Sequence, residues 1–208
     1  MAPTLPAAIP DALYLLDYFG IAVFAISGAL LAAEKRQTLV TFLFFATITG
    51  VGGGTVRDLL IGAPVFWVHG NVTLLICLAA GLAVWLTPRH RWTKRVLDWF
   101  DALGLADYAV YGASKALAFG IAPVPAIAMG VLTACVGGII RDVLAGEPSI
   151  LMRPEIYVTA AALAAGLFVG LTLLGVPLLV AAFIGAAAGF ILRALAITRG
   201  LKLPAYHP

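Results

Sequence analysis

Charged residues are scarce in this sequence. Asp, Glu, Lys and Arg make up 11% of its 208 residues, whereas hydrophobic residues make up 62%. Ordinary soluble domains contain about 25% charged and about 45–50% apolar residues. A soluble fold of this length could not cover its core with so few charges, so we expect lipid to be its solvent. We expect no nucleic-acid partner.

Cysteines are few, and catalytic motifs are missing. Cys77 and Cys135 both lie within apolar runs, which favours neither a disulfide framework nor a metal site. The sequence contains no Walker A motif, no HExxH motif and no complete GxGxxG motif in a strand–helix setting. Its three histidines are scattered and form no triad with serine and aspartate. We therefore expect no enzyme, no bound metal and no cofactor.

Long apolar runs are abundant. A membrane-spanning helix needs about 20 mostly apolar residues. Seven segments meet this requirement: Leu13–Ala33, Leu39–Ile61, Phe66–Leu86, Leu97–Phe119, Val124–Ala145, Ile156–Leu174 and Pro177–Ala196. Turn residues or charges separate them. The sequence thus predicts an all-α membrane protein of seven transmembrane helices in a single domain, residues 1–208.

The basic residues predict the orientation of these helices. They fall in the first, third and fifth loops and towards the C-terminal end: Lys35, Arg36, Arg89, Arg91, Lys94, Arg95, Arg153, Arg193, Arg199 and Lys202. With seven spans, all of these loops lie on one side of the membrane. The positive-inside rule then places the N-terminus outside and the C-terminus in the cytoplasm of a cell with an inner or plasma membrane location.

A motif recurs at a spacing of 84 residues. The segment beginning at Gly53 (GGTVRD) returns at Gly137 (GGIIRD), and the same offset pairs Asp17 with Asp101 and Gly28 with Gly112. Each copy holds three spans, residues 11–86 and 97–174, and residues 177–196 form a seventh helix outside the repeat. Three crossings invert the second copy relative to the first. Inverted repeats are common in transporters and channels, whose functional path follows the repeat interface.

Glycines gather in the second helix of each repeat. The first copy carries Gly52, Gly53 and Gly54, and the second carries Gly137 and Gly138. Adjacent glycines invite a kink or an unwound turn, and backbone carbonyls freed there must line protein or water. Such carbonyls are suitable ligands for a dehydrated monovalent cation. The alternative is that these glycines only allow close helix packing.

Charges within the predicted spans must avoid lipid. Each costs about 2.5–3.5 kcal/mol near the bilayer centre, so these side chains must pair, snorkel or face the bundle interior. Because residues adjacent on a helix do not face each other, the repeat suggests reciprocal ion pairs, Arg57 with Asp142 and Arg141 with Asp58. A pore-lining role for the same four residues is the open alternative.

The fourth span is the most polar. Asp107, Tyr111 and Lys115 follow one another at intervals of four, so they share a helix face that should border water or a permeation path. Lys115 lies deep in the span, and its movement would respond to voltage. The alternative is a static pair of Lys115 with Asp107.

Three hydroxyl groups are further candidates for the ion path. Ser27 precedes a glycine on the first helix, and the repeat-related Thr49 and Thr133 precede the glycine segments. These hydroxyls could supplement carbonyl ligands, although such groups often bond back to their own helix.

Small residues at GxxxG spacing lie on the last two helices. Gly185 and Gly189 have this spacing on the seventh helix, and Gly166 and Gly170 have it on the sixth. Such faces allow close contact within or between subunits, which gives modest support to oligomerisation.

The paired GG-x-x-RD motifs, each followed by Gly-x-Pro at Gly62 and Gly146, carry a family resemblance. From about Asp11 to Ala196 the sequence resembles prokaryotic members of the trimeric intracellular cation channel (TRIC) family, a group also labelled as glycine transporters. This resemblance implies a homotrimer with a pore in each subunit, lined by the second and fifth helices and permeable to potassium and sodium. It also implies a gating role for a lysine of the fourth helix, which is Lys115 here.

Two classes of function follow. The first is a passive channel for monovalent cations, favoured by two symmetric glycine segments and few fixed charges. The second is a carrier for glycine or a similar small zwitterion, since inverted repeats with broken helices suit alternating access equally well. In the carrier, Arg57 or Arg141 would hold the carboxylate of the substrate.

Overall fold

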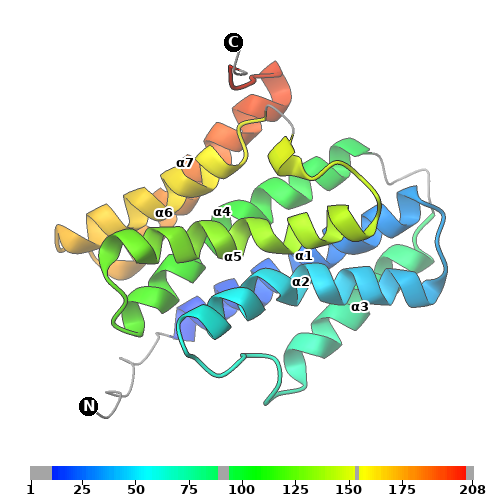
Figure 1. Cartoon of the computed structure of the whole chain (residues 1–208), viewed down its shortest axis with the longest axis horizontal. Coiled ribbons are helices and arrows are strands. Elements are labelled where there is room, and N and C mark those ends of the chain that lie inside the picture. Colours follow the sequence, from blue (N-terminus) through cyan, green and yellow to red (C-terminus); the bar gives the residue numbers. More distant parts are fainter. Residues whose placement is uncertain (1–10, 89–93, 153–154, 205–208) are drawn as a thin grey trace.

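The computed structural model describes residues 11–88, 94–152 and 155–204. This part of the chain contains seven α-helices and one short 3-10 helix (Figure 1): α1 (Asp11–Glu34), α2 (Leu39–Leu60), α3 (Val72–Leu86), α4 (Lys94–Ala118), α5 (Pro123–Leu144), η2 (Ile150–Met152), α6 (Val158–Leu173) and α7 (Leu178–Arg199). The described residues form no strand beyond one isolated bridge, between Glu155 and Lys202. The predicted all-α fold with seven helices is confirmed.

The start of α3 differs from the prediction by six residues. The predicted span begins at Phe66, but the helix begins at Val72. A side chain explains the difference, because Asp58 Oδ2 accepts a hydrogen bond of 3.1 Å from the Phe66 amide. Trp67 also donates to Thr55 of α2, at 2.9 Å. The segment is therefore held against the end of α2 before a new helix can begin.

Two three-helix units lie side by side, with α7 added to the second. Within the first unit α1, α2 and α3 pack on one another, and within the second α4, α5 and α6 do the same. The units meet where α2 packs on α5 and α1 on α4, while α7 packs on α4 and α6. In Figure 1, α3 and the α6–α7 pair lie at opposite ends of this arrangement, so α1, α2, α4 and α5 form its centre.

The connections fall at two ends of the bundle. Figure 1 shows the α1–α2 and α5–α6 connections at one end, and the α4–α5 and α6–α7 connections at the other. Odd-numbered and even-numbered connections thus lie at different ends, as expected when each helix crosses the bundle once. Four helices, α1, α2, α5 and α7, are both long and apolar enough to span a bilayer, whereas α3 and α6 are shorter. Large apolar side chains such as Leu86 and Phe183 are exposed on the outside, where lipid is their natural solvent.

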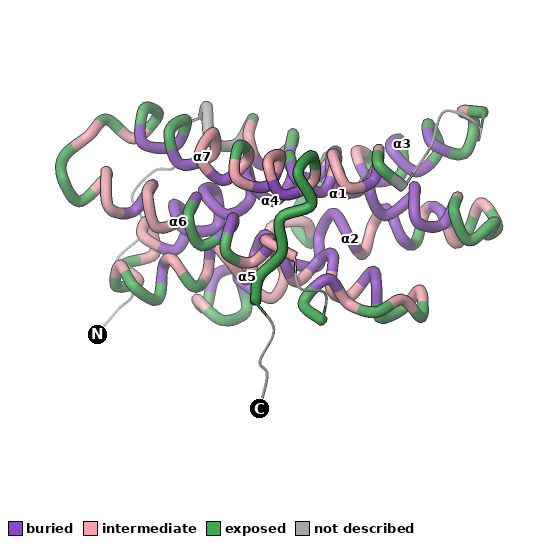
Figure 2. Tube along the Cα trace, turned by 90° about the horizontal axis from the view of Figure 1, so that it is seen from above, coloured by how far each residue is buried: buried purple, intermediate pink, exposed green. Residues whose placement is uncertain are grey.

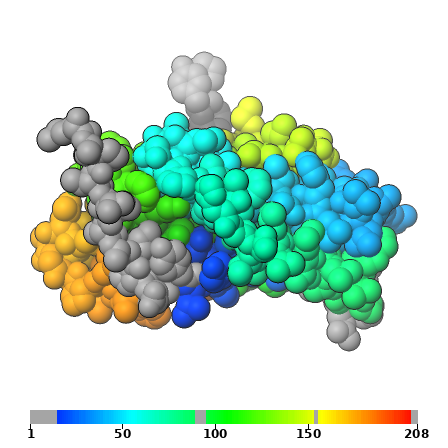
Figure 3. Space-filling model, turned by 90° about the horizontal axis from the view of Figure 1, so that it is seen from below, coloured from blue at the N-terminus to red at the C-terminus, as the bar shows by residue number. Residues whose placement is uncertain are grey.

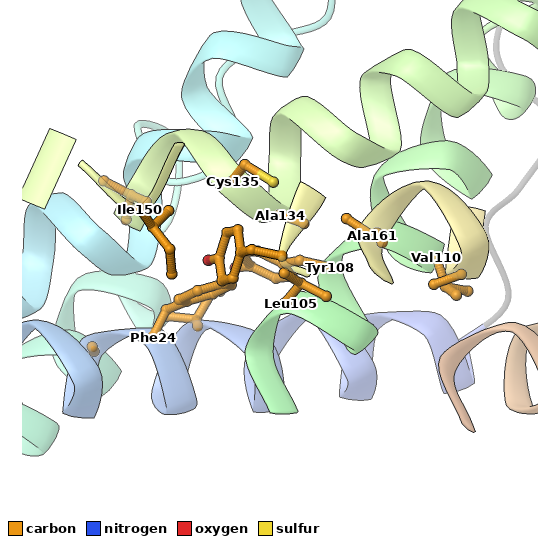
Figure 4. Close-up of a cluster of buried hydrophobic side chains, with 14 of the residues drawn as sticks. Phe24, Leu105, Tyr108, Val110, Ala134, Cys135, Ile150 and Ala161 are labelled. Carbon is orange, nitrogen blue, oxygen red and sulfur yellow. The ribbon is translucent and has the colours of Figure 1, made fainter. Parts of the chain in front are cut away.

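The core lies between the two units. Buried residues follow the inner sides of the central helices (Figure 2). The rings of Phe24 on α1 and Tyr108 on α4 lie 5.2 Å apart in this core, and Cys135 of α5 packs in the same cluster (Figure 4). Small residues join α7 to α6, because a Cβ at Gly185 or Gly189 would meet the backbone of α6. The described structure places nothing against Gly166 and Gly170 within 4 Å.

Glycines of α2 and α5 bring these two helices into backbone contact. A methyl group at Gly53 would collide with the carbonyl oxygen of Thr133, and one at Gly137 would lie 2.5 Å from the carbonyl oxygen of Thr49. Gly52 also faces α5, since a Cβ there would lie 3.5 Å from the Cα atom of Gly137. The crossing is therefore built by residues that lack a side chain.

The glycines at the ends of these segments make room for side chains instead. A Cβ at Gly54 would lie 2.7 Å from the Phe66 ring, and one at Gly138 would lie 3.4 Å from the Tyr157 hydroxyl. The α-helical backbone continues without interruption through both segments. The predicted unwound turn is therefore wrong for both helices, because the glycines serve close packing, whereas the predicted kink stays a prediction.

This crossing predicts a position-dependent effect of a single methyl group. Gly53→Ala should lower the free energy of unfolding by about 1–3 kcal/mol, because the methyl group overpacks the contact with Thr133. Gly166→Ala on α6 is the matched control and should be neutral or stabilising by up to about 1 kcal/mol, because alanine favours helix. Thermal unfolding of both variants in detergent measures the difference. A Gly53→Ala variant as stable as Gly166→Ala contradicts the close contact.

Candidate functional site

Buried polar side chains gather where the two units meet. Most come from α1, α2, α4 and α5, and each is less than 8% exposed: Asp17, Ser27, Thr49, Arg57, Asp58, Asp101, Asp107, Ser114, Lys115, Thr133, Arg141 and Asp142. They include every polar residue that the sequence singles out, apart from Tyr111, which is also buried. Charges cannot face lipid cheaply, so this interior position is the expected one. They form two ionic clusters with hydroxyl groups between them.

The Arg141 cluster is closed by a two-pronged ion pair. Arg141 donates from Nη1 to Asp101 Oδ1 at 2.7 Å and from Nη2 to Asp101 Oδ2 at 3.1 Å. Its Nε donates to Asp142 Oδ1 at 2.9 Å. Ser27 of the other unit donates to Asp101 at 2.6 Å and accepts from Arg141. Asp142 also accepts the Ile150 amide at 3.2 Å. One cation thus lies between two carboxylates, with good geometry on each.

The Arg57 cluster is built around one carboxylate. Asp58 accepts from Arg57 Nε at 2.9 Å and from Lys115 Nζ at 2.9 Å, and it also accepts the Phe66 amide. The second guanidinium contact, Arg57 Nη2 to Asp58 Oδ1 at 2.8 Å, lacks hydrogen-bond geometry. The guanidinium lies 5.2 Å from the Tyr111 ring centre, and Lys115 Nζ lies 5.7 Å from that of Phe66. The two cations are thus held by one aspartate and by aromatic faces.

The two clusters are copies of each other at an offset of 84 residues. Their equivalent positions are Arg57 and Arg141, Asp58 and Asp142, Phe66 and Ile150, Asp17 and Asp101, Tyr111 and Ser27, and Lys115 and Leu31. In both copies the aspartate accepts a hydrogen bond from the backbone amide of the residue eight positions later. The copies differ most at the last pair, where a buried lysine in one stands in place of a leucine in the other. Asp17 correspondingly forms no ion pair within the described residues and is hydrogen-bonded to Tyr111.

The predicted reciprocal ion pairs are wrong. Each arginine pairs with the aspartate beside it in the chain, because the long arginine side chain folds back along the end of its own helix. Inversion of the repeat explains why the reciprocal pairs cannot form. The motifs end α2 and α5, two helices that run in opposite directions, so Arg57 and Asp142 lie towards opposite ends of the bundle. The alternative pair of Lys115 with Asp107 is also absent among the described contacts, since Lys115 binds Asp58.

Weakly polar groups and one carboxylate occupy the middle of the interface. The Thr133 hydroxyl donates to Met129 O of its own helix at 2.6 Å, whereas the buried Thr49 hydroxyl has no hydrogen-bond partner in the described structure. Asp107 Oδ2 likewise lacks a described partner and lies against Gly20 of α1. Tyr108 donates to the Gly50 carbonyl of α2 at 3.3 Å. Unpaired buried oxygens are uncommon, and these two lie within the zone between the clusters.

Sequence reasoning missed three charged residues of the interior. It paired Asp17 with Asp101 in the repeat but assigned neither to the site, although two aspartates matched within apolar spans were a usable signal. It also counted Arg193 with the basic residues near the C-terminal end. In the structure Arg193 is 2% exposed within α7, donates to Glu155 Oε2 at 2.6 Å and lies 5.2 Å from the Tyr157 ring centre.

Most acidic groups of this interface are already bound by other groups of the protein. Nearly all of its carboxylates are tied to cations, hydroxyls or amides, and the described residues contain no group of His, Cys, Asp and Glu able to hold a metal ion. The interface thus holds two ionic clusters, with the hydroxyl groups of Thr49 and Thr133 between them.

Comparison with known proteins gives this fold its class. The structure superposes on that of the TRIC trimeric intracellular cation channel orthologue from Rhodobacter sphaeroides with a TM-score of 0.87 and 45% sequence identity, over 92% of this chain and 100% of that one. Fold and family are those of membrane channels and not of enzymes. The protein is therefore a multi-pass membrane protein with the channel fold of this group.

The relatives found by sequence are also membrane proteins. The inner membrane protein YadS of Escherichia coli K12 is 40% identical over 93% of this chain and 95% of its own length. A membrane protein of Vibrio cholerae is 44% identical over 71% of this chain, a match that spans 63% of the relative. The sequence model of the family described as "Glycine transporter" matches twice, at residues 14–89 and 98–173. The chain belongs to this family.

The unequal clusters predict unequal effects at equivalent aspartates. Asp101→Asn removes half of a buried ion pair and should lower the free energy of unfolding by about 3 kcal/mol, since an uncompensated buried charge remains. Asp17→Asn, the matched substitution in the other repeat, alters one hydrogen bond and should lower it by about 1 kcal/mol. Denaturation of the two variants in detergent compares them. Equal losses contradict the assignment of the stronger ion pair to Asp101.

Proposed function

We propose that this protein is a channel for monovalent cations, potassium and also sodium, with one pore in each subunit of a homotrimer. The observation that carries the proposal is the file of buried polar groups along the interface of two inverted repeats. The likeness to solved TRIC channels supports it. No cofactor has a place in this function, and the permeant ion is the only ligand.

In the proposed path, an ion passes between α1, α2, α4 and α5. It enters at the Arg141 cluster, passes the Thr49 and Thr133 region, and leaves at the Arg57 cluster, or it travels in reverse. Direct contacts close both ends in this conformation, since Ser27 touches Arg141 and Lys115 touches Asp58. A conducting state requires these side chains to separate.

Lys115 is the proposed gating residue. Its ammonium group is buried and held by one aspartate and one aromatic ring, without a second carboxylate of its own within 4 Å among the described residues. A charge that crosses the whole membrane field changes its energy by about 2.3 kcal/mol per 100 mV. Even a partial displacement of Lys115 therefore links opening to voltage. The positive-inside rule supports an extracellular N-terminus and a cytoplasmic C-terminus.

The second candidate is a carrier for glycine or a similar small zwitterion. The description of the matching family as a glycine transporter favours it. In this scheme an arginine of one cluster binds the substrate carboxylate, and a neighbouring aspartate binds its ammonium group. The Arg57 cluster suits this role better, because its guanidinium lacks the two-pronged partner that Arg141 has.

Single-channel recording in a planar bilayer tests the channel. With unequal KCl on the two sides, unitary currents should reverse near the potassium and not the chloride equilibrium potential. Lys115→Gln should flatten the voltage dependence while keeping the cation preference, because it removes a buried charge without opening a large cavity. Lys202→Gln, an exposed lysine beyond α7, is the matched control and should behave as the parent protein does.

The same preparation separates the two candidates. Flat traces at all voltages from folded protein, together with saturable uptake of labelled glycine that Arg57→Ala abolishes, remove the channel in favour of the carrier. Currents without uptake remove the carrier. Equal voltage dependence in the Lys115→Gln and parent proteins contradicts the assigned gating residue.

A further inference from the structure

A groove lies at one end of the bundle, and none of the residues of the two ionic clusters lines it. It has a volume of about 540 Å³ and lies between the α1–α2 turn, the start of α2 and the end of α3. Its apolar wall includes Phe42, Val84, Trp85 and Leu86, and its polar rim includes Arg36. Trp85 packs edge-on against Phe42 with ring centres 5.0 Å apart. Figure 3 shows the face on which the α1–α2 turn lies beside the end of α3.

Arg36 has an unusual backbone conformation at the rim of this groove. Its φ of 55° is the only positive φ of a non-glycine residue in the described chain, whereas five glycines have positive values. One of these is Gly120, with a φ of 76°, and it is the exact repeat equivalent of Arg36 at the offset of 84. The same turn is thus built with glycine in one repeat and with arginine in the other. Left-handed backbone is strained for a residue that bears a side chain, so arginine is less favourable than glycine for the backbone at this position.

The guanidinium of Arg36 is available to a ligand. The side chain is exposed, and the described structure places no carboxylate within 4 Å of it, whereas the preceding Lys35 is paired with Glu147. The first turn of α2 begins three residues later and carries no acidic residue, so its amide groups add positive potential near the arginine. The rim therefore favours an anion.

The wall of the groove favours hydrocarbon. Trp85 is 43% exposed and Leu86 is 71% exposed, although both are large apolar residues. They lie at the end of a membrane helix, the level at which tryptophan is enriched and lipid headgroups begin. A ligand with an anionic head and an apolar tail matches both parts of the groove.

We propose that this groove binds one anionic phospholipid, with its phosphate on Arg36 and an acyl chain against Trp85 and Leu86. The occupant is a lipid of the surrounding bilayer, because the groove joins a cation to an apolar wall at the membrane surface. A free anion would leave the apolar wall uncovered. The proposal requires only that the chain is in a membrane, so it holds for a channel and for a carrier alike.

Native mass spectrometry of the detergent-purified protein tests the site with phosphatidylglycerol and phosphatidylcholine. The parent protein should retain phosphatidylglycerol preferentially, and Arg36→Gly should weaken that binding about tenfold, as expected for loss of a charged hydrogen bond. Glycine suits the positive φ, so this variant should unfold at the same or a higher temperature. Arg36→Gln should weaken binding similarly, whereas Arg199→Gln, an equal charge change on the exposed end of α7, should not.

A second readout places the lipid tail. Dibrominated phosphatidylglycerol should quench the tryptophan fluorescence of the parent protein, and Trp85→Phe should remove most of that quenching. Equal weakening by Arg36→Gln and Arg199→Gln overturns the proposal, because binding then reflects overall charge. No preference for phosphatidylglycerol over phosphatidylcholine overturns it too. A changed oligomeric state in Arg36→Gly with unchanged lipid retention overturns it in favour of a neighbouring subunit in the groove.

Discussion

The contacts between the two units depend on two buried arginines, each near the end of the second helix of a repeat. Within a bilayer a charged side chain needs partners from the protein itself. The aspartate next in the chain supplies one partner, and the facing repeat supplies another contact, since Ser27 binds Arg141 and Lys115 binds Asp58. These contacts join the two units near both ends of the bundle. The glycine crossing of α2 and α5 joins them at the middle.

Duplication makes the departures from symmetry informative. Both arginines keep their neighbouring aspartate, and both aspartates keep the amide cap eight residues further on. The facing helix differs, because Tyr111 and Lys115 stand opposite Arg57, whereas Ser27 and Leu31 are their equivalents at Arg141. The additional lysine, Lys115, forms an ion pair with the carboxylate of Asp58. One cluster therefore holds a tight two-pronged ion pair and the other holds two cations around one carboxylate, so the two clusters differ in electrostatic character.

The sequence predicts the fold well because its signals are local. Apolar runs of membrane length and a motif repeated at one offset require no knowledge of contacts. The start of α3 is missed because a side chain, Asp58, binds the Phe66 amide, and nothing in the apolar pattern records such a bond. The observed ion pairs are not predicted, because the repeat of the motif does not by itself record that α2 and α5 run in opposite directions. The glycines are ambiguous in principle, since one composition serves both an unwound turn and a close crossing.

The close crossing constrains how a path can open. Where Gly53 faces a carbonyl of α5 there is no side chain to rotate away, and a backbone contact yields only if whole helices move. Protein interiors are close-packed and resist such shifts. Long side chains, by contrast, can rotate without the movement of a whole helix, and such side chains close both ends of the polar file. If ions pass between the repeats, the crossing is the fixed point and the arginine clusters are the places where the path opens.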